Sequence, residues 1–237
     1  DRVDRKISDI RLKYVDDTYG EAIQAGDGIH GLIDSLKEHP EVGTPLYGPL
    51  INTVTRGARL KKFYLRSAPT GVGKSRSMIA DACYIACDEI YDERFGWIHN
   101  GTKEPTLYIA TEQEKSEIQT MMLAFLSAVN EEHILNGQYI GDEEERVRKA
   151  ADILADSPLY IEELPDFSLK DIEDKIKKNI RDHGVKYVFH DYIHTSLKIL
   201  EEITRRSGGV KLREDNILFM LSTKLKDLCN QYGVFIM

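Results

Sequence analysis

Cysteine, tryptophan and long apolar runs are scarce in this chain, which has 237 residues, three cysteines and one tryptophan. Three cysteines do not suggest a disulfide framework, and we expect Cys83 and Cys87, four residues apart on a predicted helix, to pack as buried thiols. No apolar run approaches the ~20 residues that span a bilayer, and no basic segment followed by an apolar one opens the chain as a secretion signal. We therefore expect a cytoplasmic protein that does not contact a membrane.

An excess of positive charge is also absent, because the formal net charge is −8 at pH 7. This argues against a nucleic-acid coat protein with a generally basic surface, but not against a local basic segment. Internal repeats and low-complexity segments are lacking as well. The hydrophobic content of 41% is that of an ordinary globular protein. The length suits one large α/β domain, or such a domain with an appendage.

Apolar strand-like runs alternate with helical periodicity over residues 43–237. This alternation predicts an α/β domain with a mainly parallel sheet. The expected strands are Lys62–Ser67, Pro105–Thr111, Pro158–Leu164, Val185–Asp191 and the terminal run "YGVFIM". The expected helices are Lys74–Asp92, one with apolar positions from Ile118 to Val129, one opened by a Ser168–Asp171 capping box and closed by Gly184, and one with apolar positions from Ile217 to Leu228.

Residues 1–42 are charged and predict a helical linker or arm, with helical segments at Asp4–Tyr14 and Gly28–Lys37. A loosely ordered terminus is the alternative. The chain starts with Asp1 instead of methionine and stops within an apolar run. We therefore expect a fragment of a longer polypeptide, with its main domain, 43–237, truncated at the C-terminal end.

The stretch "RSAPTGVGKSRSM" places a glycine-rich turn between a predicted strand and a predicted helix. Such a turn exposes backbone N–H groups to phosphate, and the N-terminus of the helix adds more. Lys74 is expected to reach the β and γ phosphates, and Ser75 to bind Mg²⁺. The candidate nucleotide-binding residues are Ala68, Pro69, Thr70, Gly71, Val72, Gly73, Lys74, Ser75 and Arg76. Ala68 replaces the usual first glycine, and a chance glycine-rich turn is the alternative.

Two acidic residues follow predicted strands and are candidates for chemistry. Asp191 ends an apolar strand, at the edge where a parallel sheet meets the phosphate loop, and is expected to hold Mg²⁺. Glu112 ends another strand and is assigned as the general base that polarises the attacking water. The alternatives are a simple strand-end acid and a surface-loop glutamate. Because a small-molecule kinase needs no such second acid, the pair favours ATP hydrolysis.

Several stretches together resemble the ATPase domain of the hexameric replicative DNA helicases, the DnaB-like group within the RecA-like ATPases. They are "APTGVGKS", "TLYIATEQEKSEIQTMMLAFLSAV", "PLYIEEL", "KYVFHDYIHTS" and "LSTKLKDLCNQYGVFIM", in the order of the family's motifs. The resemblance covers Gly43 to Met237. Departures at Pro69, at Ile51 and Asn52 and at His194 fit a divergent, phage-type member.

The resemblance implies a RecA-like P-loop NTPase core that uses ATP and Mg²⁺, with Lys74, Glu112 and Asp191 as catalytic residues and Ser75 and Asp191 as metal ligands. It further implies translocation on single-stranded DNA as a homo-oligomer, a hexameric ring, with a primase or helicase loader as a possible class of partner. In the family a polar sensor and an arginine finger follow the last strand. We therefore expect this fragment to bind nucleotide better than it hydrolyses it.

The segment "ITRRSGGVKLRED" is the candidate DNA contact. Its cations are Arg205, Arg206, Lys211 and Arg213, and cations on a flexible loop can follow a single-strand backbone without reading sequence. A solvated hairpin is the alternative.

Aromatic and imidazole side chains near the candidate site are expected to pack. His190 and His194 flank Asp191, and we expect them to be packed or hydrogen-bonded and not to bind zinc. Tyr192 and the aromatic run "RFGWIH" are likewise expected to pack in the core or a loop.

Two other functions remain open on the sequence. A recombinase-like or clock-type RecA ATPase shares the core but does not unwind DNA. A nucleotide-binding regulator or helicase partner that has lost hydrolysis has no use for Glu112.

Overall fold

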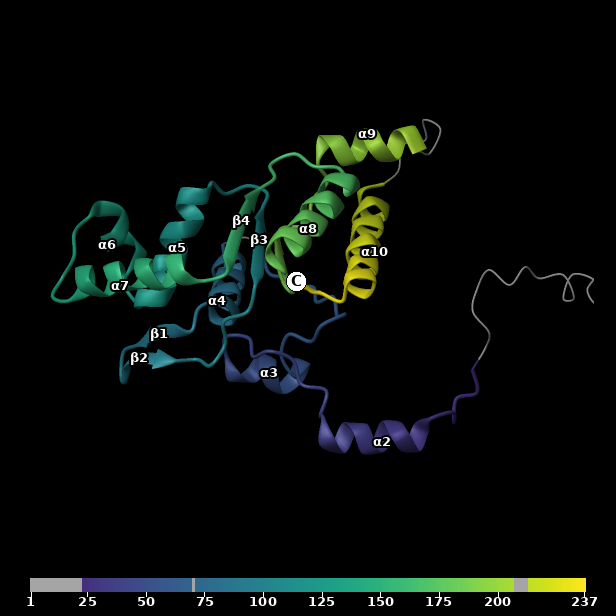
Figure 1. Cartoon of the computed structure of the whole chain (residues 1–237). Helices are drawn as coiled ribbons and strands as arrows, with labels where there is room; N and C mark the ends of the chain where they lie inside the picture. Colours follow the sequence, from purple (N-terminus) through teal and green to yellow (C-terminus); the bar gives the residue numbers. More distant parts are fainter. Residues whose placement is uncertain (1–22, 70, 207–212) are drawn as a thin grey trace, which may run out of the picture. The chain divides into compact units, whose positions relative to one another are not determined.

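The computed structural model describes residues 23–69, 71–206 and 213–237 (Figure 1). The chain divides into two compact units, Asp1–Glu41 and Val42–Met237. The described part of the first unit contains helix α2, Ile29–Glu38. None of the residues of this helix is buried. This helix confirms the prediction at Gly28–Lys37, whereas the predicted helix at Asp4–Tyr14 lies outside the described residues.

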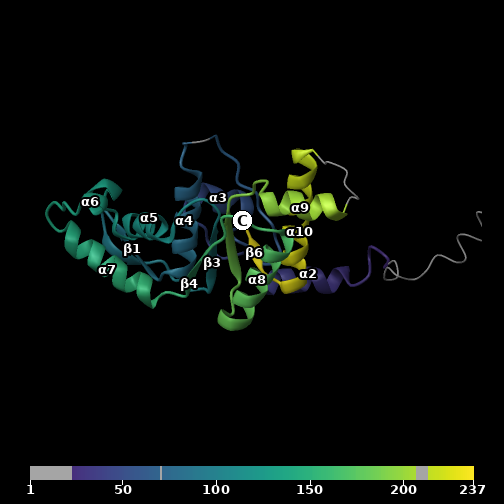
Figure 2. The same ribbon diagram turned by 90° about the horizontal axis from the view of Figure 1, so that it is seen from above.

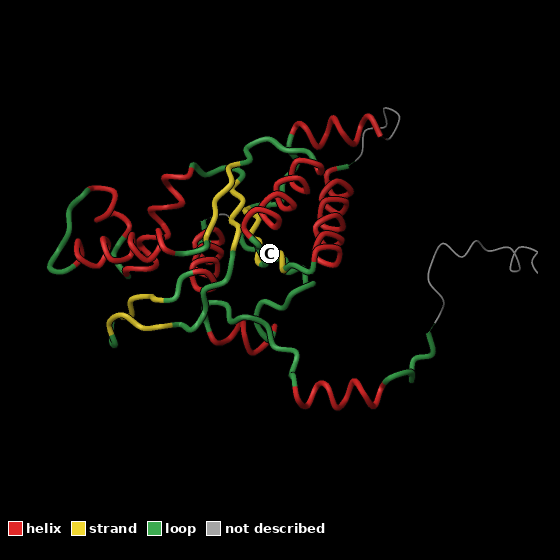
Figure 3. Tube along the Cα trace, in the orientation of Figure 1, coloured by secondary structure: helices red, strands yellow, loops and turns green. Residues whose placement is uncertain are grey.

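The second unit is built on a parallel sheet with the strand order β4-β3-β5-β6, and Figure 3 shows its strands in yellow. The strands are β3 (Thr106–Ala110), β4 (Leu159–Glu163), β5 (Tyr187–Asp191) and β6 (Phe235–Ile236). Ala110 pairs with Glu163 on one side and with Asp191 on the other. The carboxyl ends of three strands therefore lie level at one edge, as the predicted parallel sheet requires.

Helices cover both faces of this sheet (Figures 1 and 2). One face packs against α4 (Lys74–Ala86), α5 (Lys115–Ser127) and α7 (Glu143–Asp156). The other packs against α8 (Leu169–His183), α9 (Leu197–Arg206) and α10 (Glu214–Tyr232). Two shorter helices are α3 (Pro49–Thr55) and α6 (Glu131–Asn136).

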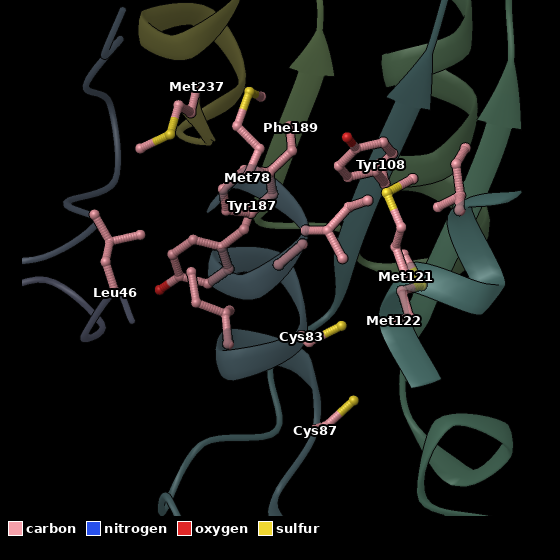
Figure 4. Packing of buried hydrophobic residues seen from close by; sticks show 14 of the residues in the cluster. Leu46, Met78, Cys83, Cys87, Tyr108, Met121, Met122, Tyr187, Phe189 and Met237 are labelled. Carbon is pink, nitrogen blue, oxygen red and sulfur yellow. The ribbon is translucent and has the colours of Figure 1, made fainter. Parts of the chain in front are cut away.

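Successive strand residues point to opposite faces, so each strand contributes to two hydrophobic cores. Tyr108 and Phe189 join the core over α4 and α5, where Figure 4 shows Phe189 near Met78 and Tyr108 near Met121. Leu107 joins the opposite core. Burial on both faces explains why these strands are nearly continuous apolar runs. The cysteines at 83 and 87 are buried free thiols, as predicted.

Helix α8 begins and ends where its terminal residues predict. Ser168 Oγ accepts a hydrogen bond from the Asp171 N–H at 3.0 Å, and an Asp171 carboxylate oxygen accepts one from the Ser168 N–H at 2.9 Å. Gly184 ends the helix in the left-handed conformation, with φ of 67°. Both predictions are confirmed because capping depends on residues adjacent in the chain.

The predicted helix Lys74–Asp92 is wrong in its last third. Helix α4 ends at Ala86, and the chain then forms a hairpin of β1 (Glu89–Asp92) and β2 (Gly96–His99). Asp92 Oδ1 accepts hydrogen bonds from the N–H groups of Arg94 and Phe95 and so closes the turn. Most of the aromatic run around Trp97 forms β2, and Trp97 and Ile98 pack against the core, as expected.

The predicted strand Lys62–Ser67 is reduced to an isolated bridge between Phe63 and Ile236. The segment lies beside β6, because Ile236 N–H donates to Lys62 O at 3.1 Å and Tyr64 N–H donates to Ile236 O at 2.9 Å. With only two residues in β6, the pairing is too short to make a ladder. The predicted terminal strand is confirmed as β6.

Within the described ranges, no helix has the length and apolar character needed to cross a bilayer.

Candidate nucleotide-binding site

The glycine-rich loop runs into the N-terminus of α4 from the carboxyl edge of the sheet. Gly71 and Gly73 have φ of 83° and 88°, in the left-handed region that residues with a Cβ rarely adopt. Gly73 precedes the first helical residue, no side chain caps the helix, and its first turn contains no acid. The N–H groups and the dipole of α4 are thus presented to an anion. Thr70, one of the predicted loop residues, lies outside the described residues.

Lys74 contacts two side chains at the end of β5, those of Asp191 and Tyr192. Its Nζ is 3.5 Å from Asp191 Oδ1 and 4.0 Å from the centroid of the Tyr192 ring. The two residues meet because α4 begins with Lys74 at the edge of the sheet where β5 ends with Asp191. The predicted meeting of Lys74 and Asp191 at one edge is present in the structure.

Asp191 is 5% exposed, and its two oxygens have different partners. Oδ2 accepts a hydrogen bond from Tyr108 Oη at 2.8 Å. Burial and the Asp191 carboxylate raise the pKa of Tyr108 well above its ordinary value, so this phenol keeps its proton. Among the described residues, none hydrogen-bonds to the buried Oδ1. A carboxylate oxygen in this state fits a site for a hard cation such as Mg²⁺.

Ser75 and Arg76 follow Lys74 in the first turn of α4. Ser75 is half-buried and lies at the same cavity as Lys74. The Arg76 guanidinium forms an ion pair with Glu131, at the start of α6. Ser75, a predicted metal ligand, and Arg76, the last predicted loop residue, therefore both line the cavity.

Glu112 follows β3 and is exposed at the same edge of the sheet. Its Oε1 accepts a hydrogen bond from Tyr192 Oη at 2.7 Å. This bond is the main reason that the pKa of Tyr192 lies above its ordinary value. The sequence predicted only that Tyr192 packs. Its position directly after Asp191, the acid at the end of β5, is the signal that could have indicated its place at the site.

A cavity of about 780 Å³ adjoins these groups. Its volume is in the range of small-molecule sites, ~300–1,000 Å³. The lining residues from the predicted site are Ala68, Pro69, Gly71, Gly73, Lys74, Ser75, Arg76 and Glu112, and Tyr192 joins them. Val72, the remaining described loop residue, is exposed.

Arg66 anchors the segment that enters the loop, a role that the sequence did not show. It donates to Ser77 Oγ at 2.9 Å and to Asp81 Oδ2 at 2.6 Å. Asp81, 1% exposed on α4, also accepts a hydrogen bond from the Tyr47 N–H at 2.8 Å. Burial raises the pKa of Asp81, and the Arg66 charge opposes that rise.

His190 and His194 both pack edge-on against Phe167, at centroid separations of 5.5 and 5.0 Å. Burial lowers the pKa of His190 to about 4, so its ring is neutral at pH 7. In the described segments, no cluster of three or more metal-ligating side chains occurs.

The candidate DNA segment is described only at its two ends. Arg205, exposed near the end of α9, lies 4.0 Å from Glu201 Oε2. Arg213, before α10, lies 3.2 Å from Asp215 Oδ1. The side chain of Arg206 and all of Lys211 lie outside the described residues. Neither Arg205 nor Arg213 lines the nucleotide cavity.

A parallel sheet between two helical layers, with a glycine-rich loop and an acid at its carboxyl edge, is the arrangement of the P-loop NTPase fold. Residues 49–237 match the family model of the DnaB-like helicase C terminal domain. This match spans most of the chain, so the protein belongs to that family, and the resemblance stated above is confirmed.

The chain is also similar to a curated relative and to two solved structures. The SPbeta prophage-derived uncharacterized protein YorI of Bacillus subtilis (strain 168) is 44% identical over 233 residues, which are 98% of this chain and 46% of that protein. The chain thus spans about half the length of this relative.

Solved structures similar to the chain include a DnaB-like replicative helicase that was studied with its interactions with primase. It gives a TM-score of 0.72 at 14% identity and covers 100% of this chain and 52% of its own. The ATPase domain of a further protein gives 0.68 at 14% identity, covering 91% and 70%. At this identity the likeness shows the fold alone, which is the predicted RecA-type ATPase fold with a helical N-terminal part.

Proposed function

We propose that this chain is the motor domain of an ATP-dependent DNA helicase, which hydrolyses ATP to translocate on single-stranded DNA and unwind duplex DNA during replication. The observation that carries this proposal is the meeting of three groups at one edge of the sheet. Lys74 and Glu112 line one cavity, and Asp191 lies 3.5 Å from the lysine ammonium. Membership of the DnaB-like family supports the same reaction.

Binding of the triphosphate is assigned to the loop and to the start of α4. The left-handed backbone at Gly71 and Gly73 turns N–H groups towards the phosphates. Lys74 neutralises the terminal phosphates, for which it exchanges its present contact with Asp191. Ser75 and Asp191 would hold Mg²⁺, which supplies positive charge to the β and γ phosphates when bound.

Glu112 is proposed as the general base. Its carboxylate stands at the cavity, just after β3, which pairs with the Asp191 strand. A carboxylate within hydrogen-bond reach of a water can accept its proton as the oxygen attacks the γ-phosphate.

Coupling to DNA is proposed for the full-length protein in a homohexameric ring. Arg205, Arg206, Lys211 and Arg213 are proposed to contact the single-strand backbone. A primase or a helicase loader is the proposed class of protein partner, supported by the primase interactions of the similar DnaB-like replicative helicase. The prophage origin of YorI supports a phage-type member of the family.

Steady-state ATP hydrolysis by the full-length protein, with and without single-stranded DNA, tests this function. We expect strong stimulation by DNA and a loss of about a hundredfold or more in Lys74→Ala, because the terminal phosphates lose their cation. The control, Lys103→Ala, removes an exposed lysine that pairs with Asp156 and should leave turnover unchanged.

The other outcomes separate the competing functions. Stimulation by DNA without unwinding of a forked duplex would favour a recombinase-type ATPase. Hydrolysis at the same rate with and without DNA would contradict the proposed DNA contact of the segment 205–213. Tight nucleotide binding without turnover, with Glu112→Gln silent, would favour a non-hydrolysing helicase partner.

A further inference from the structure

Tyr192 contacts two of the side chains to which the chemistry is assigned. Its hydroxyl donates a hydrogen bond to Glu112 Oε1 at 2.7 Å. Its ring lies 4.0 Å, centroid to Nζ, from the Lys74 ammonium, in a cation–π contact. A single side chain thus joins the phosphate-binding lysine and the base.

The backbone of Tyr192 is held by the sheet and not by a free loop. Its N–H donates to Thr111 Oγ1 at 3.1 Å. Thr111 is 3% exposed, and its N–H and hydroxyl both donate to Asp191 O at 3.0 Å. The ends of β3 and β5 therefore fix where the Tyr192 ring begins, which is the support that a precise site needs.

The Glu112 side chain, in contrast, is not held by burial. It is exposed, and Tyr192 provides the hydrogen bond that its carboxylate accepts within the described part of the chain. An exposed glutamate samples several rotamers, whereas a general base works only within hydrogen-bond reach of its water. The Tyr192 hydroxyl selects among these rotamers.

Resting on the hydrolytic function proposed above, we propose that Tyr192 is a positioning residue that holds the Glu112 carboxylate at the cavity and ties its place to that of Lys74. When phosphate draws the Lys74 ammonium, the ring that carries the Glu112 hydrogen bond loses its cation. Occupancy of the phosphate site and the place of the base therefore depend on the same side chain.

Tyr192→Phe tests this role, because it removes the hydroxyl and keeps the ring under Lys74. We expect kcat for ATP hydrolysis by the full-length protein to fall about tenfold, since the base is no longer held in place. The Kd of a fluorescent ADP analogue and the Tm should stay unchanged. The control, Tyr160→Phe, removes the same atom from β4, where the ring stacks on His183 at 4.0 Å.

A second background separates positioning from a general structural effect. In Glu112→Asp the carboxylate is one methylene shorter, so we expect it to lose the hydrogen bond from the Tyr192 hydroxyl. Adding Tyr192→Phe to that variant should then lower kcat by less than about twofold, because the two changes remove the same interaction.

Each contrary result has its own meaning. Wild-type kcat in Tyr192→Phe, with hydrolysis abolished in Glu112→Gln, overturns the role of Tyr192 and leaves the proposed function intact. An equal loss in both backgrounds, or a lower Tm, shows a structural role and also overturns it. Full hydrolysis in Glu112→Gln overturns the proposed function first, and this inference with it.

Discussion

At the scale of single residues, the two oxygens of Asp191 divide their work. Tyr108 Oη holds Oδ2 at 2.8 Å, while the buried Oδ1 faces the Lys74 ammonium at 3.5 Å. A buried polar atom without a hydrogen bond is rare in folded proteins, and here the Lys74 ammonium is its ionic partner. The sequence predicted the acid, but which oxygen is free depends on Tyr108, on the neighbouring strand.

At the same scale, Gly73→Ala should weaken nucleotide binding about tenfold, because a Cβ at φ of 88° strains the backbone by ~1–2 kcal/mol. No atom lies within 4 Å of that Cβ, so the effect comes from conformation and not from a clash.

Gly31→Ala is the matched control for this change. Gly31 lies in α2, and its added Cβ also meets nothing within 4 Å. Titration of a fluorescent nucleotide measures both variants, and equal affinities in the two would contradict the importance of the left-handed turn.

At the scale of elements, the phosphate loop is anchored to α4 through Arg66. The guanidinium bonds Ser77 and Asp81 one turn apart on the helix, so the segment beside β6 and the helix after the loop are held together. Because the segment has only one β-bridge, at Phe63, these side-chain bonds replace the ladder that the sequence predicted.

Arg66→Met should therefore lower the free energy of unfolding by about 3 kcal/mol, because it leaves the buried Asp81 carboxylate without its cation. Urea denaturation measures the change. The control, Arg94→Met, alters an exposed arginine in the β1–β2 turn and should have little effect. A similar small change in both variants would contradict the anchoring role.

The same scale shows how far local signals reach. The ends of α8 follow from Ser168 and Gly184, because the capping partners are only a few positions away. The hairpin after Ala86 was not predicted. In the sequence Tyr91 and Trp97 are equally compatible with a helix or a loop, and only the pairing of β1 with β2 brings their ring centroids to 5.5 Å.

At the scale of the whole molecule, the candidate nucleotide site and the proposed DNA contact lie on different elements. The nucleotide cavity lies at the start of α4, and the described cations of the proposed DNA contact lie on or beside α9 and α10. Arg205 and Arg213 stand at the ends of α9 and α10, which cover the face of the sheet opposite to α4. For the proposed helicase function, a change of the bound nucleotide would have to reach these arginines through the sheet.

Replacing Arg205 and Arg206 together by glutamine should weaken binding of single-stranded DNA and reduce the salt dependence of log Kd by about one to two units. A control pair, Arg94→Gln with Arg181→Gln, removes equal charge from exposed positions on β1–β2 and α8. Fluorescence anisotropy at several salt concentrations measures both, and identical behaviour would remove the DNA assignment from α9.

The sequence by itself determined the elements and motifs that depend on neighbouring residues: four apolar strands, the ends of α8, the glycine-rich turn and the acids at strand ends. Each of these is set by backbone preference or by periodicity within a few positions. Only the tertiary structure decided which side chains meet. The Tyr192 hydroxyl and Glu112 are 80 positions apart, and Tyr108 and Asp191 are 83 apart. Their contacts arise because β3 and β5 pair in one register, and no local pattern encodes that register.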